Sequence, residues 1–141
     1  MCIRDRLAIE FRHEDWFSKK SGLESIAESM RHHNISTVIT DVAGRRDVLH
    51  MNLTTDTAMI RFVGNDFHPT DYSRIDEWVE RLEGWINKGV KNIYFFCHEP
   101  DNLLAPELCH YFSERIKKIK GVVTRGPKFY ESEEGEQLSL F

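Results

Sequence analysis

Residues 58–97 contain three segments in succession: AMIRFV (58–63), YSRIDEWVERLEGWINK (72–88) and IYFFC (93–97). The first and third are short and apolar, which is typical of strands inside a sheet. The second has apolar residues at helical spacing and is followed by Gly89, a residue that suits the end of a helix. A strand, a helix and a second strand in this order predict two parallel strands joined by a crossover helix.

The same alternation extends along the rest of the chain. We predict further strands at 7–12 and 37–40, helices at 21–34 and 107–120, and a long irregular loop at 44–56. Four strands that alternate with helices predict an α/β fold, in which helices pack against a parallel sheet. Because the strand at 93–97 is almost wholly apolar, we expect both of its faces to be buried.

The composition is that of an ordinary single domain. The chain has 141 residues, of which 40% are hydrophobic and 30% charged, and its formal net charge is -4. This charge disfavours a protein that holds nucleic acid mainly by neutralising phosphates, although a local basic patch stays open. Three cysteines without zinc-site spacing are typical of reduced thiols, and no apolar stretch reaches the roughly 20 residues that span a membrane. We therefore expect a cytoplasmic protein without membrane contact.

Both ends differ from the middle of the chain. Residues 1–6 (MCIRDR) are charged and join abruptly to the apolar residues 7–9, and we interpret them as translated library-adapter sequence in front of native sequence. Residues 7–125 form the predicted domain. Residues 126–141 are polar and acidic, and we predict that they form a disordered tail.

Polar residues accompany the ends of all four predicted strands. In parallel β/α folds the carboxyl ends of the strands meet at one edge of the sheet, where active sites form. We therefore predict a functional site at this edge. It carries Glu10, Arg12 and His13 from the first strand, Asp41 from the second, Arg61 from the third, and His98, Glu99 and Asp101 from the fourth.

Several of these residues allow two interpretations. Glu10 and Arg12 lie two positions apart, so they share a face of their strand, and Arg61 can reach Glu10. The two arginines can hold a phosphate or carboxylate, or the three residues can form a structural ion pair between strands, and both interpretations stay open. Asp41 can serve as a general base, a metal ligand or a hydroxyl acceptor, or it can cap a turn.

A metal site is a further alternative. The residues Glu10, His13, Asp41, His98 and Glu99 carry ligand atoms suited to a divalent metal. No two of them have the i, i+4 spacing that places two ligands on one helix face. The sequence therefore leaves the metal and any cofactor undetermined.

Several segments resemble the YecE-like family, also called domain of unknown function 72. They are AIEFRH (8–13) followed by Trp16 and Phe17, Thr40-Asp41, IRFVG (60–64), the helix with Trp78 and Trp85, and Ala105-Pro106-Glu107. The resemblance implies a TIM-like barrel of eight β/α units, of which this chain matches the last four. His98-Glu99 departs from the two asparagines that the family usually has there. Because the function of the family is not established, the resemblance implies a fold and the place of a site, but no reaction.

A partial barrel raises a question of stability. Four units alone would leave uncovered the edges of the first and last strands and the inner face of the barrel. We therefore expect the isolated chain to be unstable, to aggregate or to dimerise.

The last five residues point to a partner. Gln137, Leu138, Ser139, Leu140 and Phe141 resemble the short peptide with which bacterial replication and repair proteins bind the DNA sliding clamp. Such an extended peptide inserts apolar side chains into pockets, and its glutamine forms hydrogen bonds at the entrance. The alternative is that these apolar residues fold back onto their own domain.

These observations lead to hypotheses from different functional classes. One is a non-catalytic interaction protein that its tail recruits to the sliding clamp, and another is a barrel that only binds a ligand. The principal hypothesis is an enzyme that acts on an anionic substrate, either phosphorylated or derived from nucleic acid. In it, Arg12, His13, Arg61 and Glu99 bind the substrate, and Glu10, Asp41 and His98 perform catalysis.

Overall fold

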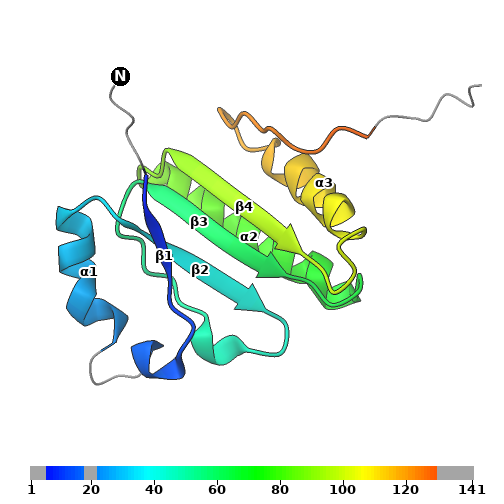
Figure 1. The fold of residues 1–141 in the computed structure, drawn as a ribbon. Helices are drawn as coiled ribbons and strands as arrows, with labels where there is room; N and C mark the ends of the chain where they lie inside the picture. Colours follow the sequence, from blue (N-terminus) through cyan, green and yellow to red (C-terminus); the bar gives the residue numbers. More distant parts are fainter. Residues whose placement is uncertain (1–5, 18–21, 130–141) are drawn as a thin grey trace, which may run out of the picture.

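The computed structural model describes residues 6–17 and 22–129, which form one sheet with helices (Figure 1). The predicted leader, apart from Arg6, and the clamp-binding peptide lie outside these ranges. The strands are β1 (Ala8–Glu10), β2 (Ser36–Val42), β3 (Thr57–Val63) and β4 (Asn92–His98). The α-helices are α1 (Leu23–His32), α2 (Pro69–Asn87) and α3 (Ala105–Ile116), and the short 3-10 helices are η1 (Glu14–Phe17) and η2 (Arg46–Val48).

The strands form a single parallel sheet in the order β1-β2-β3-β4. The predicted α/β fold, with parallel strands and outer helices, is confirmed. In the register of the sheet, Arg61 of β3 lies opposite Thr40 of β2 on one side and Phe96 of β4 on the other. Side chains at paired positions point to the same face, so these three form a row across the sheet.

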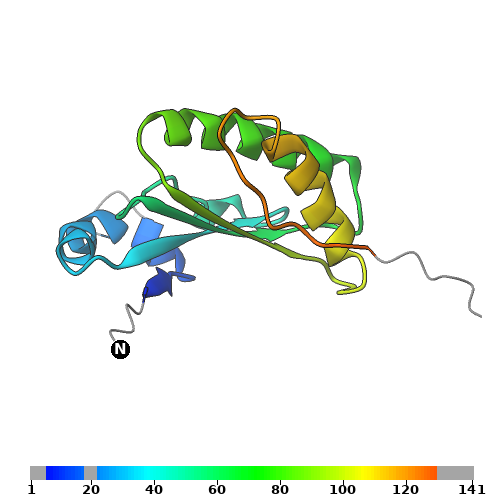
Figure 2. The ribbon, with the colours of Figure 1, turned by 90° about the horizontal axis from the view of Figure 1, so that it is seen from above.

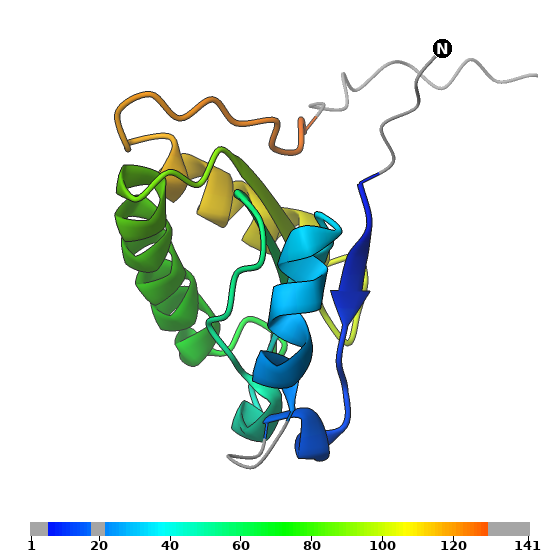
Figure 3. The same ribbon diagram turned by 90° about the vertical axis from the view of Figure 1, so that its left-hand side faces the viewer.

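One face of the sheet is covered by helices and forms the core. Figure 2 shows α2 and α3 together above one side of the sheet, and in Figure 3 α1 and α2 lie on the same side of β1. The phenyl ring of Phe95 in β4 stacks on that of Phe112 in α3, with ring centroids 3.8 Å apart. This face buries the apolar side chains of Ile39, Ala58, Ile60, Phe62, Ile75, Trp78, Leu82, Leu108 and Ile116.

The connection between β2 and β3 is a loop that packs against the core, as a crossover helix would. It was predicted as irregular, and apart from the short η2 it has no regular structure. Val48 is buried in it, and Leu49 and Leu53 pack against the core. The loop is held to β2 by its own polar groups, because the hydroxyl of Thr37 donates to the carbonyl of Asn52 at 2.5 Å.

The other side of the sheet, which we call the open face, carries large side chains that reach solvent. Tyr94 and Phe96 of β4 are 41% and 53% exposed. The prediction that both faces of this strand are buried is therefore wrong. Alternate residues of a strand point to opposite faces, and within the described ranges the helices pack on only one of them.

Most element boundaries lie within a few residues of the predictions. α2 begins at Pro69, earlier than the predicted residue 72, because the His68 side chain accepts a hydrogen bond from the backbone N–H of Thr70. α3 ends at Ile116 rather than at residue 120, because tighter bonds such as that from Ile119 N–H to the Ile116 carbonyl take over. No helix in the described part of the chain is long and apolar enough to cross a membrane.

Candidate functional site

A charged cluster lies on the open face near the carboxyl ends of three strands. We call Glu10, Arg12, Thr40 and Arg61 the open-face cluster. The hydroxyl of Thr40 donates to Glu10 Oε1 at 2.9 Å, and Arg12 Nη2 donates to Glu10 Oε2 at 3.1 Å. Arg61 Nη1 lies 3.6 Å from Glu10 Oε1. The expectation that Arg61 reaches Glu10 is therefore confirmed.

The electrostatics of this cluster favour a permanently charged carboxylate. Burial on its own raises the pKa of Glu10, but hydrogen bonds from Arg12 and Thr40 and the positive charges of Arg12 and Arg61 together outweigh it and hold the pKa below its ordinary value. Two guanidinium groups surround one carboxylate, so the cluster keeps one excess positive charge. This charge faces solvent, since the Arg12 side chain is 74% exposed.

Exposed aromatic rings adjoin the cluster. Phe96 is the register partner of Arg61, and Tyr94 is the partner of Met59 on the same strand pair. The apolar character of the strand predicted that both rings are buried, so neither was expected at the site. The signal that could have found them is the alternation of IYFFCH (93–98), which places Tyr94, Phe96 and His98 on one face.

Both predicted histidines of the site are exposed. His98 ends β4 opposite Val63, on the same face as Phe96. His13 follows β1, and its Nδ1 lies 3.3 Å from the carboxylate of Asp15 in η1.

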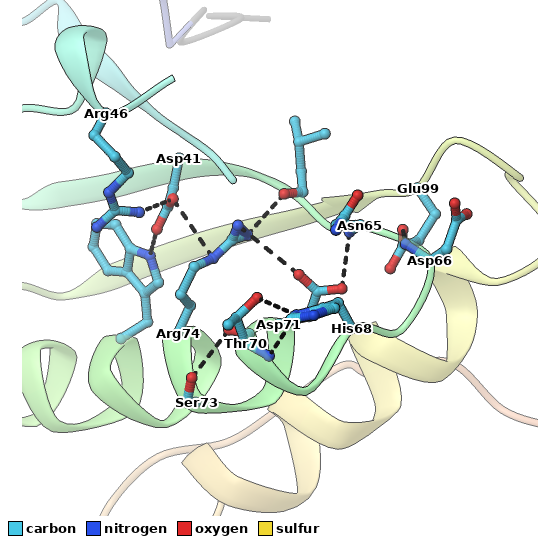
Figure 4. Close-up of polar contacts among 12 residues, drawn as sticks. Asp41, Arg46, Asn65, Asp66, His68, Thr70, Asp71, Ser73, Arg74 and Glu99 are labelled. Atoms are coloured by element: carbon cyan, nitrogen blue, oxygen red, sulfur yellow. Dashed lines mark hydrogen bonds and ion pairs between the residues drawn. The ribbon is translucent and has the colours of Figure 1, made fainter. Parts of the chain in front are cut away.

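Asp41 points away from the open face. It follows Thr40 directly, so its side chain projects toward the helices instead. There it is buried, and it accepts hydrogen bonds from the indole N–H of Trp78 at 2.7 Å and from Arg46 Nη1 at 2.6 Å. Asp41 Oδ1 is also 3.8 Å from Nε of Arg74 (Figure 4). The structure therefore does not bring Asp41 together with Glu10 and Arg61.

Glu99 is also buried on the helix side, where it braces the loop between β3 and α2. Its Oε2 accepts the backbone N–H of Asp66 at 3.0 Å, and its carboxyl group packs directly against Gly64. Asp66 and its neighbour Phe67 have positive φ angles of 53° and 57°, a strained backbone for residues other than glycine. Fully buried, Glu99 is not available to a substrate on the open face.

A buried network of Asp41, Asp71, Arg74 and Glu99 lies behind the strand ends (Figure 4). Glu99 binds the β3–α2 loop, and Arg74 of α2 links Asp41 to Asp71. Its Nη2 donates to the carbonyl of Val63 at 2.7 Å, and its Nη1 lies 3.9 Å from Asp71 Oδ1. Its guanidinium group also lies over the ring of Phe62, 4.2 Å from the centroid. Arg74 and Asp71 were not predicted as site residues, because a charged helix residue ordinarily faces solvent.

The buried network is incompletely satisfied. Within the described part of the chain, four of its buried atoms have no hydrogen-bond partner: Asp71 Oδ1, Glu99 Oε1, and Nε and Nη1 of Arg74. Buried polar atoms of this kind are costly and are commonly served by water. Through the bonds to the Val63 carbonyl and from the Asp66 N–H, the network holds the end of β3 and the β3–α2 loop in place behind the open face.

The five residues considered for a metal site do not gather in one place. Glu10 lies on the open face, whereas Asp41 and Glu99 are buried on the helix side. Across residues 6–17 and 22–129, no group of three or more His, Cys, Asp or Glu side chains is placed to hold a metal ion.

The match to known proteins settles the family. The model of the family described as "Protein of unknown function DUF72" matches residues 2–131. The chain belongs to the DUF72 family. The resemblance to the YecE-like family is thereby confirmed, and the DUF72 match covers both the open-face cluster and the buried network.

Curated relatives and solved structures agree with this assignment. The UPF0759 protein YecE of Escherichia coli K12 is 27% identical over 128 residues, which cover 78% of this chain and 46% of that protein. A DUF72 family protein of Enterococcus faecalis V583, EF0366, matches with a TM-score of 0.60 at 15% identity, over 86% of this chain and 51% of that one. The DUF72 protein TM1631 of Thermotoga maritima MSB8 matches with a TM-score of 0.50 at 25% identity, over 82% and 46%.

The chain spans about half the length of the DUF72 proteins it matches. Its four parallel strands with helices on one side agree with part of a TIM-like barrel. In such a barrel the open face is the inner face, and the carboxyl ends of the strands form the edge that carries the open-face cluster.

Proposed function

We propose that the open face binds an anionic, nucleic-acid-derived small molecule such as a nucleotide, in a cytoplasmic protein. Arg61 and Arg12 would contact the anionic group, and Phe96 would stack on the base. The observation that carries this proposal is the pairing of Arg61 with the exposed ring of Phe96 in one row of the sheet.

The chemistry of the row fits both parts of such a ligand. Arginine binds phosphate through paired, charge-assisted N–H groups, and the cluster keeps one positive charge after Glu10 is counted. Stacking of a base on an aromatic side chain contributes about 1–3 kcal/mol. A flat base and a charged phosphate therefore each find a partner within one row of side chains.

The roles of the remaining residues follow from their positions. Glu10, held as a carboxylate, orients the two arginines and is a poor proton donor at neutral pH. Any proton transfer to a bound substrate would fall to His98, whose imidazole is exposed on the same face and has one ring nitrogen that can accept a proton and one that can donate. Asp41 and Glu99 would act from behind the sheet, by positioning the strand ends.

Titration of the 141-residue chain with a nucleoside monophosphate, the matching nucleoside and inorganic phosphate tests this proposal. Arg61→Ala should weaken the nucleotide by about tenfold, equal to about 1.4 kcal/mol, and leave the nucleoside unchanged. Phe96→Ala should weaken nucleotide and nucleoside alike. Arg81→Ala, an exposed arginine on α2, is the matched control and should change neither.

Equal affinities for the Arg61→Ala, Phe96→Ala and Arg81→Ala variants would refute the proposal. Turnover of the bound nucleotide would separate an enzyme from a barrel that only binds its ligand.

A second function rests on the sequence at residues 137–141, which lie outside the described part of the chain. We propose that Gln137, Leu138, Ser139, Leu140 and Phe141 bind a bacterial sliding clamp and so recruit the domain to DNA. The support is the resemblance of these residues to the clamp-binding peptide and the acidic, polar sequence before them.

Binding of the whole chain to a purified bacterial clamp tests the recruitment. We expect micromolar affinity, about -8 kcal/mol, that disappears when both Leu140 and Phe141 are changed to alanine. Leu103→Ala is a suitable control, because Leu103 is an exposed apolar residue of the domain itself. If the double variant binds as the parent chain does, the tail is not the contact.

A further inference from the structure

Two cysteines meet between β4 and α3. Cys97 of β4 packs on the helix side, and Cys109 lies in α3, the helix that covers this strand. Both are free thiols and both are partly exposed. Neither has a role in the functions proposed above.

The packing of α3 on β4 explains why the two thiols are neighbours. The rings of Phe95 and Phe112 stack, and the helix runs back along the strand in the opposite direction. From this contact, Cys97 lies two residues further along the strand, about 6.6 Å, and Cys109 lies three residues back along the helix, about 4.5 Å. The two side chains therefore lie next to each other between β4 and α3, where each thiol affects the pKa of the other.

This proximity makes the two thiols chemically unequal. The neighbouring Cys97 lowers the pKa of Cys109 to about 6, although partial burial acts in the opposite direction. The same contact, together with burial and the charge of Glu99, raises the pKa of Cys97. Cys109 is therefore the more nucleophilic of the two, because a lower pKa favours the thiolate form.

We propose that Cys97 and Cys109 are a redox pair that hydrogen peroxide oxidises to an intramolecular disulfide. The Cys109 thiolate attacks one peroxide oxygen, the O–O bond breaks, and hydroxide leaves and is protonated to water. Cys97 then loses its proton and attacks the sulfur of the resulting Cys109 sulfenic acid, which releases its oxygen as a second water. The two thiols give up two electrons, and one peroxide becomes two waters.

The bond would fasten α3 to the edge strand of the sheet. Cys97 lies between Phe96 on the open face and His98 at the strand end. Oxidation would therefore fix the strand that carries the proposed stacking residue, whether or not the nucleotide proposal holds.

The test uses the full chain with Cys2→Ser, so that only two thiols remain. Stoichiometric hydrogen peroxide should lower the mass by two hydrogen atoms, link the peptides of Cys97 and Cys109, and be reversed by dithiothreitol. Alkylation by iodoacetamide should follow a single thiolate that titrates near pH 6. Persistence of both thiols, or a disulfide formed only between two chains, would overturn the proposal.

Single substitutions separate attack from resolution. In Cys97→Ser, the sulfenic acid of Cys109 cannot form the disulfide and should be trapped by dimedone. In Cys109→Ser, Cys97 should react with peroxide about tenfold more slowly, because it has lost the neighbouring thiolate that reacts first. Circular dichroism of both variants establishes that the fold is retained. Equal reactivity of the two variants would show that the cysteines act independently and would contradict the pair.

Discussion

The same residue types differ in solvent exposure between the two faces of the sheet. Phe62 of β3 is fully buried beneath the helices, whereas Phe96 of β4, on the neighbouring strand, is 53% exposed on the open face. The same holds for carboxylates, since Asp41 is enclosed by Trp78, Arg46 and Arg74, and Glu10 is bound by arginines that reach water. Burial here is decided by what covers a face, and only secondarily by the residue that occupies it.

The largest contrast should appear when the two phenylalanines are truncated. Phe62→Ala removes a ring that contacts Phe95 and Arg74, and we expect a loss of about 3–5 kcal/mol in the free energy of unfolding. Phe96→Ala should cost less than about 1 kcal/mol, because half of its surface already meets water. Urea unfolding followed by tryptophan fluorescence measures both. Similar losses for the two variants would mean that the open face is covered in solution.

The next largest difference in stability should appear when the carboxylates of Asp41 and Glu10 are removed. Asp41→Ala leaves the buried indole N–H of Trp78 without its acceptor and removes one of the two carboxylates beside the buried Arg74, and we expect a loss of about 3 kcal/mol. Glu10→Ala should cost about 1 kcal/mol or less, because the arginines it leaves can be hydrated. The same unfolding experiment applies. A larger loss for Glu10 than for Asp41 would place the main electrostatic anchor on the open face.

A pair of glycines probes the crowding on the helix side. A Cβ at Gly64 would lie 2.1 Å from Glu99 Oε1, so Gly64→Ala must displace a buried carboxylate and should cost about 2 kcal/mol. Gly84 of α2 has nothing within 4 Å of a Cβ, and Gly84→Ala should stabilise the helix by about 0.5–1 kcal/mol. Thermal unfolding should move the two midpoints in opposite directions. Tolerance of Gly64→Ala would show that Glu99 moves freely.

The smallest effect is a pH dependence on the open face. Because the pKa of Glu10 in the folded chain lies below its ordinary value of 4.5, its carboxylate stabilises the fold above that pH. This contribution is lost as the pH falls through the folded pKa. The stability difference between the parent chain and Glu10→Gln should therefore be constant near neutral pH and shrink below about pH 4.5. A stability difference that grew on acidification would contradict a lowered pKa of Glu10 in the folded chain.

Local patterns in the sequence were enough to predict the fold. Helical spacing predicted α2, short apolar runs predicted β2, β3 and β4, and the two-residue spacing of Glu10 and Arg12 led to the pair that Arg61 completes. The main error in β4 concerns the covering of a face. An apolar strand can have one or two covered faces, and only the alternation of IYFFCH (93–98) indicates that Phe96 shares a face with His98.

The direction of the Asp41 side chain could not be predicted for a related reason. Asp41 is fixed by Trp78 and Arg74, which lie more than thirty positions away in the chain and on a different element. Residue type and strand position placed Asp41 at the correct edge of the sheet. Only the three-dimensional packing of α2 shows that its carboxylate points behind that edge.

The order β1-β2-β3-β4 has a consequence for how the domain is made. Every strand pairs with the one that precedes it in the chain, so no strand waits for a partner synthesised much later. Pairing between strands that are consecutive in the chain closes shorter loops than pairing between distant strands, and so carries a lower loop-closure cost. We expect the sheet to grow strand by strand as the polypeptide leaves the ribosome, with β4 and its covering helix α3 added last.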